Sequence, residues 1–163
     1  VFDLVVAIGV GLALACVLFM KRMSEVTDVH GWVYLDEENR TADNADNLHF
    51  KNVPKGVQVF EITGPMFFAA TEKFGNVLFD KSTKVLIIRM RSVPAIDATG
   101  IQAIEKIIAR CKKNGTKVIF SHVNEQPMKI FMKSGIFEEL GEEAFCANID
   151  DALAESEEFI KNR

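Results

Sequence analysis

Residues with which proteins usually bind metals or form disulfides are scarce in this chain of 163 residues. The three cysteines, Cys16, Cys111 and Cys146, are widely spaced and form no CxxC pair, so free thiols are predicted rather than a disulfide framework. The three histidines are also scattered, without the short spacings of metal ligands. We therefore expect no resident metal and no other cofactor.

Catalytic and nucleotide-binding signatures are absent as well. The chain has no GxGxxG turn, no P-loop and no nucleophile elbow. Its adjacent acidic residues, such as Glu138 and Glu139, are expected to be surface neighbours and not a converging acid–base pair. No enzymatic activity is predicted.

A basic stripe is also missing, because the chain carries 19 basic and 23 acidic residues and a net charge of −4. This balance argues against nucleic-acid binding. With 48% hydrophobic and 26% charged residues, the composition excludes a disordered or collagen-like chain. The length allows one ordinary domain.

Charge is almost absent from residues 1–20, VFDLVVAIGVGLALACVLFM, where Asp3 is the only charged residue. Twenty residues of helix span about 30 Å, the thickness of the hydrocarbon core of a bilayer. Lys21 and Arg22 follow at once, and basic residues mark the cytoplasmic end of a span. We therefore predict an inner-membrane span over residues 1–20 and a cytoplasmic location after about residue 22.

This apolar run has three other interpretations. A signal peptide would begin with Met and a basic segment and would have a shorter core. A helix buried inside a soluble protein fits the composition, whereas an amphipathic surface helix does not, because the run has no polar face. The missing initiator Met suggests a fragment of a longer, multi-pass chain that begins at or just before its last span.

The remainder has a net charge of −3, because it holds all 19 basic and 22 of the acidic residues. It is weakly patterned up to residue 55, with an expected edge strand at Trp32–Leu35 and an acidic loop after it. From Gly56 onward, β-branched runs alternate with helical patterns, which predicts an α/β fold with largely parallel strands. The expected strands are 57–62, 85–88, 117–120 and 145–147, and the expected helices are 66–79, 98–113, 125–134 and 149–162.

Helical spacing also predicts which side chains face the core. It directs Phe131 and Met132 inward and leaves Glu155 in solvent. In the segment Val93–Ile101, VPAIDATGI, Asp97 is the expected N-cap of the following helix, because its carboxylate can accept a hydrogen bond from an N–H group of the first turn.

Thr99 falls in the first turn of that helix, where a phosphate would face unpaired N–H groups and the positive end of the dipole. Two interpretations stay open at this point. Either Asp97 and Thr99 only cap the helix while Gly100 permits close packing, or the four residues Asp97, Ala98, Thr99 and Gly100 form a functional loop.

This tetrad resembles the signature loop of STAS domains, the module shared by anti-sigma-factor antagonists and SulP anion permeases. The stretch ITGPMFFA, which begins at Ile62, and the pair Val93-Pro94 are similar to the SulP form of the module. The apolar run likewise resembles the last membrane span of a SulP permease. The resemblance covers nearly the whole chain, apart from about residues 24–52.

The resemblance implies a mixed, mostly parallel STAS-type sheet flanked by four to five helices and preceded by a hydrophobic helix. Residues 1–22 would end the transmembrane region, residues 23–55 would form a linker with an edge strand, and residues 56–163 would form the STAS domain. The implied function is that of a cytoplasmic regulatory domain of a secondary transporter for sulfate or a related anion, which modulates transport and dimer assembly.

The implied partners are the transport domain of the same chain and a second protomer. Nucleotides and acyl carrier protein are also linked to the family, although no residue here marks either site. The alternative function is a free-standing switch protein like the anti-sigma-factor antagonists, phosphorylated at Thr99. In those antagonists a Ser precedes the Gly of the tetrad, so the Thr at this position is a departure from their pattern.

The apolar run generates a prediction about solubility. Because 20 residues without a polar face are not stable in water, we expect the purified chain to require detergent. Size-exclusion chromatography with and without a mild detergent measures this. A monodisperse chain without detergent would mean that the run is buried, for example by exchange between protomers.

Overall fold

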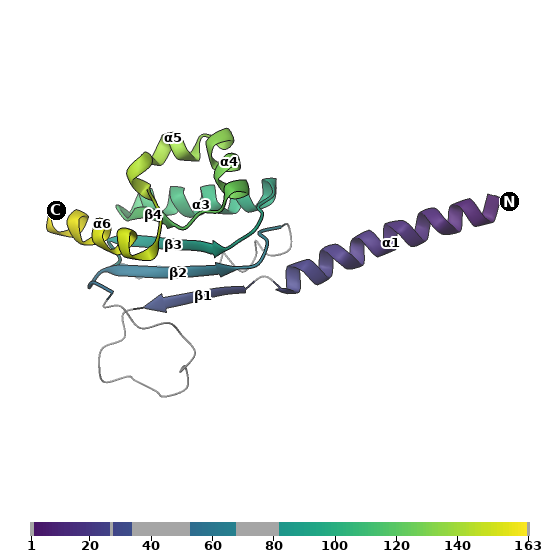
Figure 1. Cartoon of the computed structure of the whole chain (residues 1–163), viewed down its shortest axis with the longest axis horizontal. Coiled ribbons are helices and arrows are strands. Elements are labelled where there is room, and N and C mark those ends of the chain that lie inside the picture. The colour runs from purple at the N-terminus through teal and green to yellow at the C-terminus, as the bar shows by residue number, and fades with distance from the viewer. Residues whose placement is uncertain (1, 27, 34–52, 68–81, 163) are drawn as a thin grey trace, which may run out of the picture.

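The computed structural model describes residues 2–26, 28–33, 53–67 and 82–162, with backbone only for residues 2, 23–26 and 28–33 (Figure 1). An N-terminal helix, α1 (Phe2–Val26), projects away from an α/β domain. The described strands are β1 (Asp28–Val33), β2 (Val57–Thr63), β3 (Val85–Ser92), β4 (Lys117–Ser121) and β5 (Phe145–Cys146). The described helices of the domain are α3 (Ala98–Asn114), α4 (Glu125–Ser134), α5 (Ile136–Leu140) and α6 (Ile149–Lys161), with a short 3-10 turn, η3 (Glu142–Ala144).

The five strands form one sheet in the order β1-β2-β3-β4-β5. Strands β2 to β5 are parallel, and β1 pairs with β2 in the antiparallel direction. Parallel neighbours require crossover connections: α3 connects β3 to β4, and α4, α5 and η3 lie between β4 and β5. The structure therefore confirms the expected α/β fold with mostly parallel strands.

Strand β3 lies at the centre of the sheet and is apolar along most of its length. Its first four residues, Val85 to Ile88, are all buried, as expected for a parallel strand covered on both faces. Leu86 and Ile88 face the core under α3 and α4, whereas Val85 and Ile87 belong to a second cluster under α6. The sheet thus separates two hydrophobic layers.

Helix α3 covers the first layer with a single apolar face. Five residues at helical spacing on this face are buried: Ile101, Ile104, Ile107, Ile108 and Cys111. The helix ends where Gly115 adopts a left-handed conformation with φ 69°, and its N–H returns to the carbonyl oxygen of Lys112. Both the face and the stop agree with the sequence pattern.

Aromatic rings fill the space between α4, α5 and the end of the sheet. The Phe131 ring lies 5.1 Å from that of Phe120 and 5.9 Å from that of Phe145, between ring centroids. Phe137 packs on Phe145 at 4.9 Å. Such contacts add a geometric preference to the burial of apolar area, so this cluster fixes α4 and α5 against β4 and β5.

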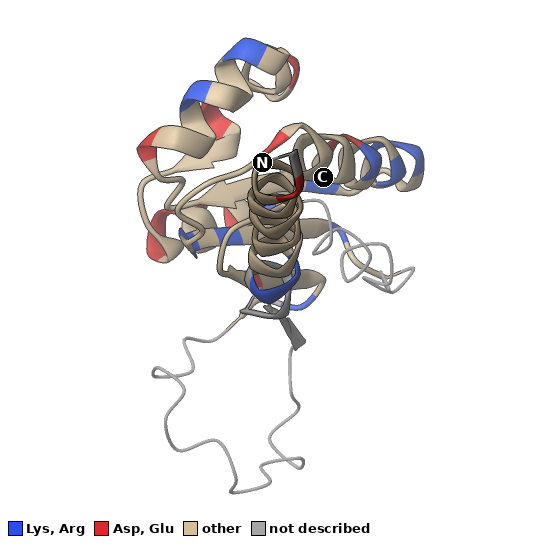
Figure 2. Ribbon diagram, turned by 90° about the vertical axis from the view of Figure 1, so that its right-hand side faces the viewer, with Lys and Arg blue, Asp and Glu red and all other residues tan. Residues whose placement is uncertain are grey.

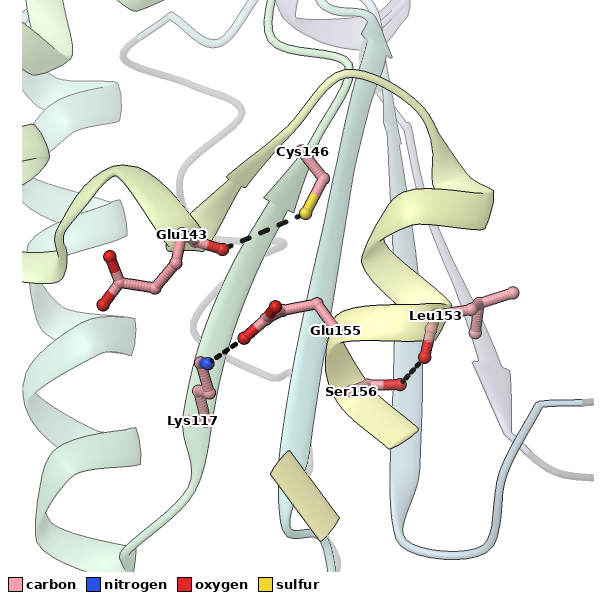
Figure 3. A network of polar contacts seen from close by, with 6 residues as sticks. All are labelled: Lys117, Glu143, Cys146, Leu153, Glu155 and Ser156. Atoms are coloured by element: carbon pink, nitrogen blue, oxygen red, sulfur yellow. Dashed lines mark hydrogen bonds and ion pairs between the residues drawn. The ribbon is translucent and has the colours of Figure 1, made fainter. Parts of the chain in front are cut away.

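Helix α6 is held to the second face of the sheet by a polar contact as well as by apolar packing (Figure 3). The Lys117 ammonium at the start of β4 contacts the Glu155 carboxylate at 2.6 Å and lies 5.0 Å from the centre of the Phe159 ring. Ser156 is fully buried and donates a hydrogen bond to the Leu153 carbonyl oxygen at 2.7 Å. The prediction that Glu155 lies in solvent is therefore wrong, because Lys117 draws it against the sheet.

Other predictions need correction or lie outside the described residues. Met132 is 54% exposed, although the spacing placed it inward, because the buried face of α4 is centred on Pro127 and Phe131. Met66 does not start a helix: it forms an isolated parallel bridge with Ile96. The rest of the expected 66–79 helix falls largely within residues 68–81, outside the described part. The expected edge strand is present as β1, earlier than predicted.

The buried aromatic cluster gives a stability prediction. Truncation of Phe131 to Ala leaves a cavity between Phe120 and Phe145, so we expect the free energy of unfolding to fall by about 3–5 kcal/mol. The neighbouring, exposed Met132→Ala should change it by less than about 0.5 kcal/mol. Thermal unfolding of the complete chain in mild detergent, followed by circular dichroism, measures both. Equal effects would contradict this packing.

Candidate functional site

The candidate loop lies at the carboxyl edge of the parallel strands, where β2 and β3 both end. The Gly64 N–H donates to the Ser92 carbonyl oxygen at 2.9 Å, so the two chains remain joined just beyond the sheet. In open α/β sheets, binding and regulatory groups gather at this edge because strands end there and helices begin. The loop then runs from Val93 to the first turn of α3.

Backbone contacts with Met66 fix the path of the loop. The Met66 N–H donates to the Ala95 carbonyl oxygen at 2.9 Å, and the Asp97 N–H donates to the Met66 carbonyl oxygen at 3.2 Å. Met66 and Ile96 are both buried, at 0% and 3% exposed. The loop is therefore a continuation of the β2–β3 pairing and not an independent surface segment.

Asp97 caps α3, as predicted. Its backbone is extended, with φ −101° and ψ −178°, and its carboxylate oxygen Oδ1 accepts the Gly100 N–H at 2.8 Å. An N-cap of this kind satisfies one of the four N–H groups that a helix leaves unpaired at its start. The carboxylate also complements the positive end of the helix dipole.

Gly100 packs directly against the loop that it follows. A Cβ atom at this position would lie 2.6 Å from the Met66 carbonyl oxygen and 2.6 Å from Cγ1 of Ile96. Real Cβ atoms do not approach a backbone oxygen so closely, so a glycine is required here for the first turn of α3 to reach the sheet. The lack of room for a Cβ atom therefore explains why the tetrad ends in glycine.

Ala98 and Thr99 are the two residues of the tetrad with accessible side chains. Ala98 is exposed and Thr99 is half-buried. A phosphate on Thr99 would meet the N-terminal dipole of α3, but it would also lie close to the Asp97 carboxylate that already caps the helix. Negative charge on Thr99 is therefore attracted by the helix dipole and repelled by the Asp97 carboxylate.

Two polar residues at the start of α4 brace the loop, and the sequence did not single them out. The Gln126 side chain accepts the Ile96 N–H at 2.9 Å and donates to the Ile96 carbonyl oxygen at 3.1 Å. The Asn124 amide donates to the carbonyl oxygens of Val93 at 2.7 Å and Arg91 at 3.0 Å. An amide side chain shortly after a buried strand was the only signal for this role in the sequence. The sequence does not reveal its partner, because the partner lies about thirty residues away.

The thiols of the domain are poorly suited to chemistry. Burial raises the pKa of the Cys111 thiol to about 11. The pKa of the Cys146 thiol is also raised. Burial has the largest effect, and the Glu155 and Asp151 carboxylates add to it. Within the described part of the chain, no three His, Cys, Asp or Glu side chains gather as a metal site would require.

The fold and this loop define the class of the protein. The STAS domain model matches residues 51–154. The chain therefore belongs to the STAS domain family, as the tetrad and the Gly64-Pro65 stretch indicated. The matched range ends inside α6 and includes β2, β3, β4 and β5.

Solved structures place the chain among STAS domains of transporters. A sulfate transporter family protein from Wolinella succinogenes is 38% identical, with a TM-score of 0.65, and the match covers 68% of this chain and 93% of that one. The STAS domain of a SulP transporter from Vibrio cholerae is 32% identical, with a TM-score of 0.58, and the match covers 68% and 88%.

A much longer curated relative matches as well. YvdB of Bacillus subtilis (strain 168), a candidate sulfate transporter by its name, is 28% identical over 153 residues. The match covers 92% of this chain but only 27% of that protein. This chain therefore spans about a quarter of the length of the relative.

The steric requirement at Gly100 gives a second stability prediction. Gly100→Ala inserts a Cβ against the Met66 carbonyl oxygen, so we expect a loss of about 1–3 kcal/mol in the free energy of unfolding. Ala98→Val adds carbon atoms at an exposed position of the same turn and should stay within about 0.5 kcal/mol. Chemical denaturation of the complete chain distinguishes the two. A neutral Gly100→Ala would show that α3 does not pack this closely.

Proposed function

We propose that this chain forms the last membrane span and the cytoplasmic STAS domain of a SulP-type secondary anion transporter, with sulfate or a related anion as substrate. The domain modulates transport and supports assembly of a homodimer. It does so without catalysis, as a recognition module. The observation that carries this proposal is the direct connection of a bare apolar helix to a STAS domain of the transporter type.

The surface of α1 supports a membrane location. The segment Asp3–Arg22 is long and apolar enough to cross a bilayer, and none of it is buried against the rest of the protein. Leu4, Val5 and Leu18 are each more than 60% exposed. In water such a surface is unfavourable by roughly 25 cal/mol for every Å² of apolar area, whereas lipid removes this cost.

The extent of the sequence match supports the same proposal. YvdB matches 92% of this chain, which leaves fewer residues unmatched than the 25 residues of α1. The match to a long transporter-like relative therefore extends into the apolar helix and is not confined to the domain. The apolar helix is thus part of what the two chains share, which supports the proposal.

The charges at the end of α1 orient the chain. Lys21 and Arg22 follow the apolar segment, while Asp3 lies at its other end. Figure 2 looks along this helix, and charged residues appear only near its ends. The positive-inside rule supports a cytoplasmic location for the Lys21 end, and with it for the STAS domain, in the proposed multi-pass inner-membrane protein.

The tetrad Asp97–Gly100 is the proposed regulatory loop. It combines a rigid backbone path, set by Met66, with an exposed position at Ala98 and a half-buried hydroxyl at Thr99. A free-standing antagonist phosphorylated at Thr99 would use the same loop. The exposed α1 argues against that alternative, because a soluble switch protein has no use for it.

The proposed loop can be tested in the intact transporter. Thr99→Glu places a negative charge beside the Asp97 cap at the start of α3, and we expect transport to change severalfold while the domain stays folded. Anion uptake into membrane vesicles, together with circular dichroism, measures both effects.

A matched control separates charge at the loop from charge on the helix. Gln102→Glu adds the same charge at an exposed position one turn later on α3 and should leave uptake unchanged. If Thr99→Glu alters only the thermal stability, Thr99 belongs to the capping region and the regulatory assignment fails.

A further inference from the structure

The residue that precedes α4 does not cap its own helix. Asn124 occupies the N-cap position, with φ −68° and ψ 164°, yet its side chain accepts no hydrogen bond from the first turn, all of which the structure describes. An Asn oxygen at this position normally accepts such a bond, as that of Asn148 does twice at the start of α6. Pro127, the third residue of α4, has no N–H group, so a cap would gain only the bond from Gln126. The Asn124 side chain is therefore available for another role.

The Asn124 amide is directed at the turn that ends β3. Its nitrogen Nδ2 lies 2.7 Å from the carbonyl oxygen of Val93, 3.0 Å from that of Arg91 and 3.3 Å from that of Met90. The Val93 N–H also donates to the Met90 carbonyl oxygen at 3.0 Å, so the backbone turns tightly around this amide. An amide nitrogen has only two hydrogens, which three carbonyl oxygens share here. Asn124 thus holds the backbone by which the chain leaves β3.

Gln126 holds the next part of the loop through both backbone groups of one residue. Its oxygen Oε1 accepts the Ile96 N–H at 2.9 Å, and its nitrogen Nε2 donates to the Ile96 carbonyl oxygen at 3.1 Å. A neighbouring β-strand would supply the same pair of bonds. On the other side of the loop, the Met66 backbone bonds to Ala95 and Asp97. The loop is therefore held between an extension of the sheet and two amide side chains of α4.

These two supports differ in how easily they open. The bonds with Met66 join backbone to backbone and continue the pairing of β2 with β3. Gln126 is an exposed residue, so water competes for its amide, and its bonds depend on side-chain torsions that can rotate. Helix α4 lies on the same side of the sheet as α3 and fully buries only Pro127 and Phe131 (Figure 1). A small displacement of α4 would therefore release the loop from the amides while the Met66 side stays paired.

We infer that Asn124 and Gln126 form a releasable amide clamp, through which the position of α4 sets the conformation of the regulatory loop. This inference rests on the proposed function, because it assigns a second control point to the same loop. Both are positioning residues: they act on transport through the backbone of Val93–Asp97. In the clamped state this backbone is fixed on two sides. In the released state it keeps Met66 and exchanges α4 for water, so transport responds to α4 without a change at Thr99.

Two substitutions open the clamp with little change in side-chain size. Asn124→Asp keeps an oxygen that can cap α4, but at pH 8 its ionised carboxylate has no hydrogen to donate to the carbonyl oxygens of the turn. Gln126→Met removes both bonds to Ile96. Glu125→Gln is the matched control, because it lies between the two and its ion pair with Lys129 is exposed to solvent.

Hydrogen exchange of the intact transporter in mild detergent, followed by mass spectrometry, measures the clamp. In Gln126→Met we expect the Ile96 amide to exchange about tenfold faster, because its acceptor is lost. In Asn124→Asp we expect faster exchange over Val93–Asp97. The amides of Val85–Ile88 in the centre of the sheet should keep their rates in both variants. Anion uptake into membrane vesicles should change severalfold in both and stay unchanged in Glu125→Gln.

Three results would overturn the clamp. They are an unchanged rate at Ile96 in Gln126→Met, an equal acceleration over Val85–Ile88 in both variants, and faster exchange of the loop with unchanged uptake. Comparison with Thr99→Glu separates this failure from that of the proposed function. If Thr99→Glu alters uptake and the two clamp variants do not, only the clamp is refuted. If none of the three alters uptake, the loop is not regulatory.

Discussion

The parallel pairing of β2 with β3 is the constraint on which the rest of the structure depends. Strand β3 is buried on both faces, so its position fixes both hydrophobic layers. The pairing continues beyond the strands through the Met66–Ile96 bridge, which delivers Asp97 to the start of α3. The same bridge positions the Met66 backbone against which Gly100 packs. The proposed regulatory loop is thus an extension of the sheet.

The charges of this chain are distributed unevenly between α1 and the domain. A helix such as α1 pairs its backbone groups internally, apart from those of its first and last turns, which is the condition for a segment that crosses lipid. In the domain, polar groups join elements that are distant in sequence, as Lys117 joins Glu155 and Gln126 joins Ile96. The mean hydropathy of +0.11 for the chain is an average over these two unlike parts.

Local chemistry made much of the fold predictable from sequence. The roles of Asp97 as the N-cap and of Gly115 as the end of α3 could be predicted because their hydrogen-bond partners lie within a few residues. The predicted exposures of Met132 and Glu155 were wrong because burial depends on elements that meet only in three dimensions, as Glu155 meets Lys117. The tetrad itself was identified, yet its bracing by Asn124 and its place at the carboxyl edge of the parallel strands depend on non-local pairing. Periodicity alone carries no information about such contacts.

The short connection between α1 and β1 has a geometric consequence. Only one residue separates the 25 residues of α1 from a strand whose six residues all pair with β2. The sheet therefore begins two Cα steps after the helix ends, at most about 7.6 Å away. Any surroundings that hold α1 in place thus also keep the edge strand of the sheet close to them.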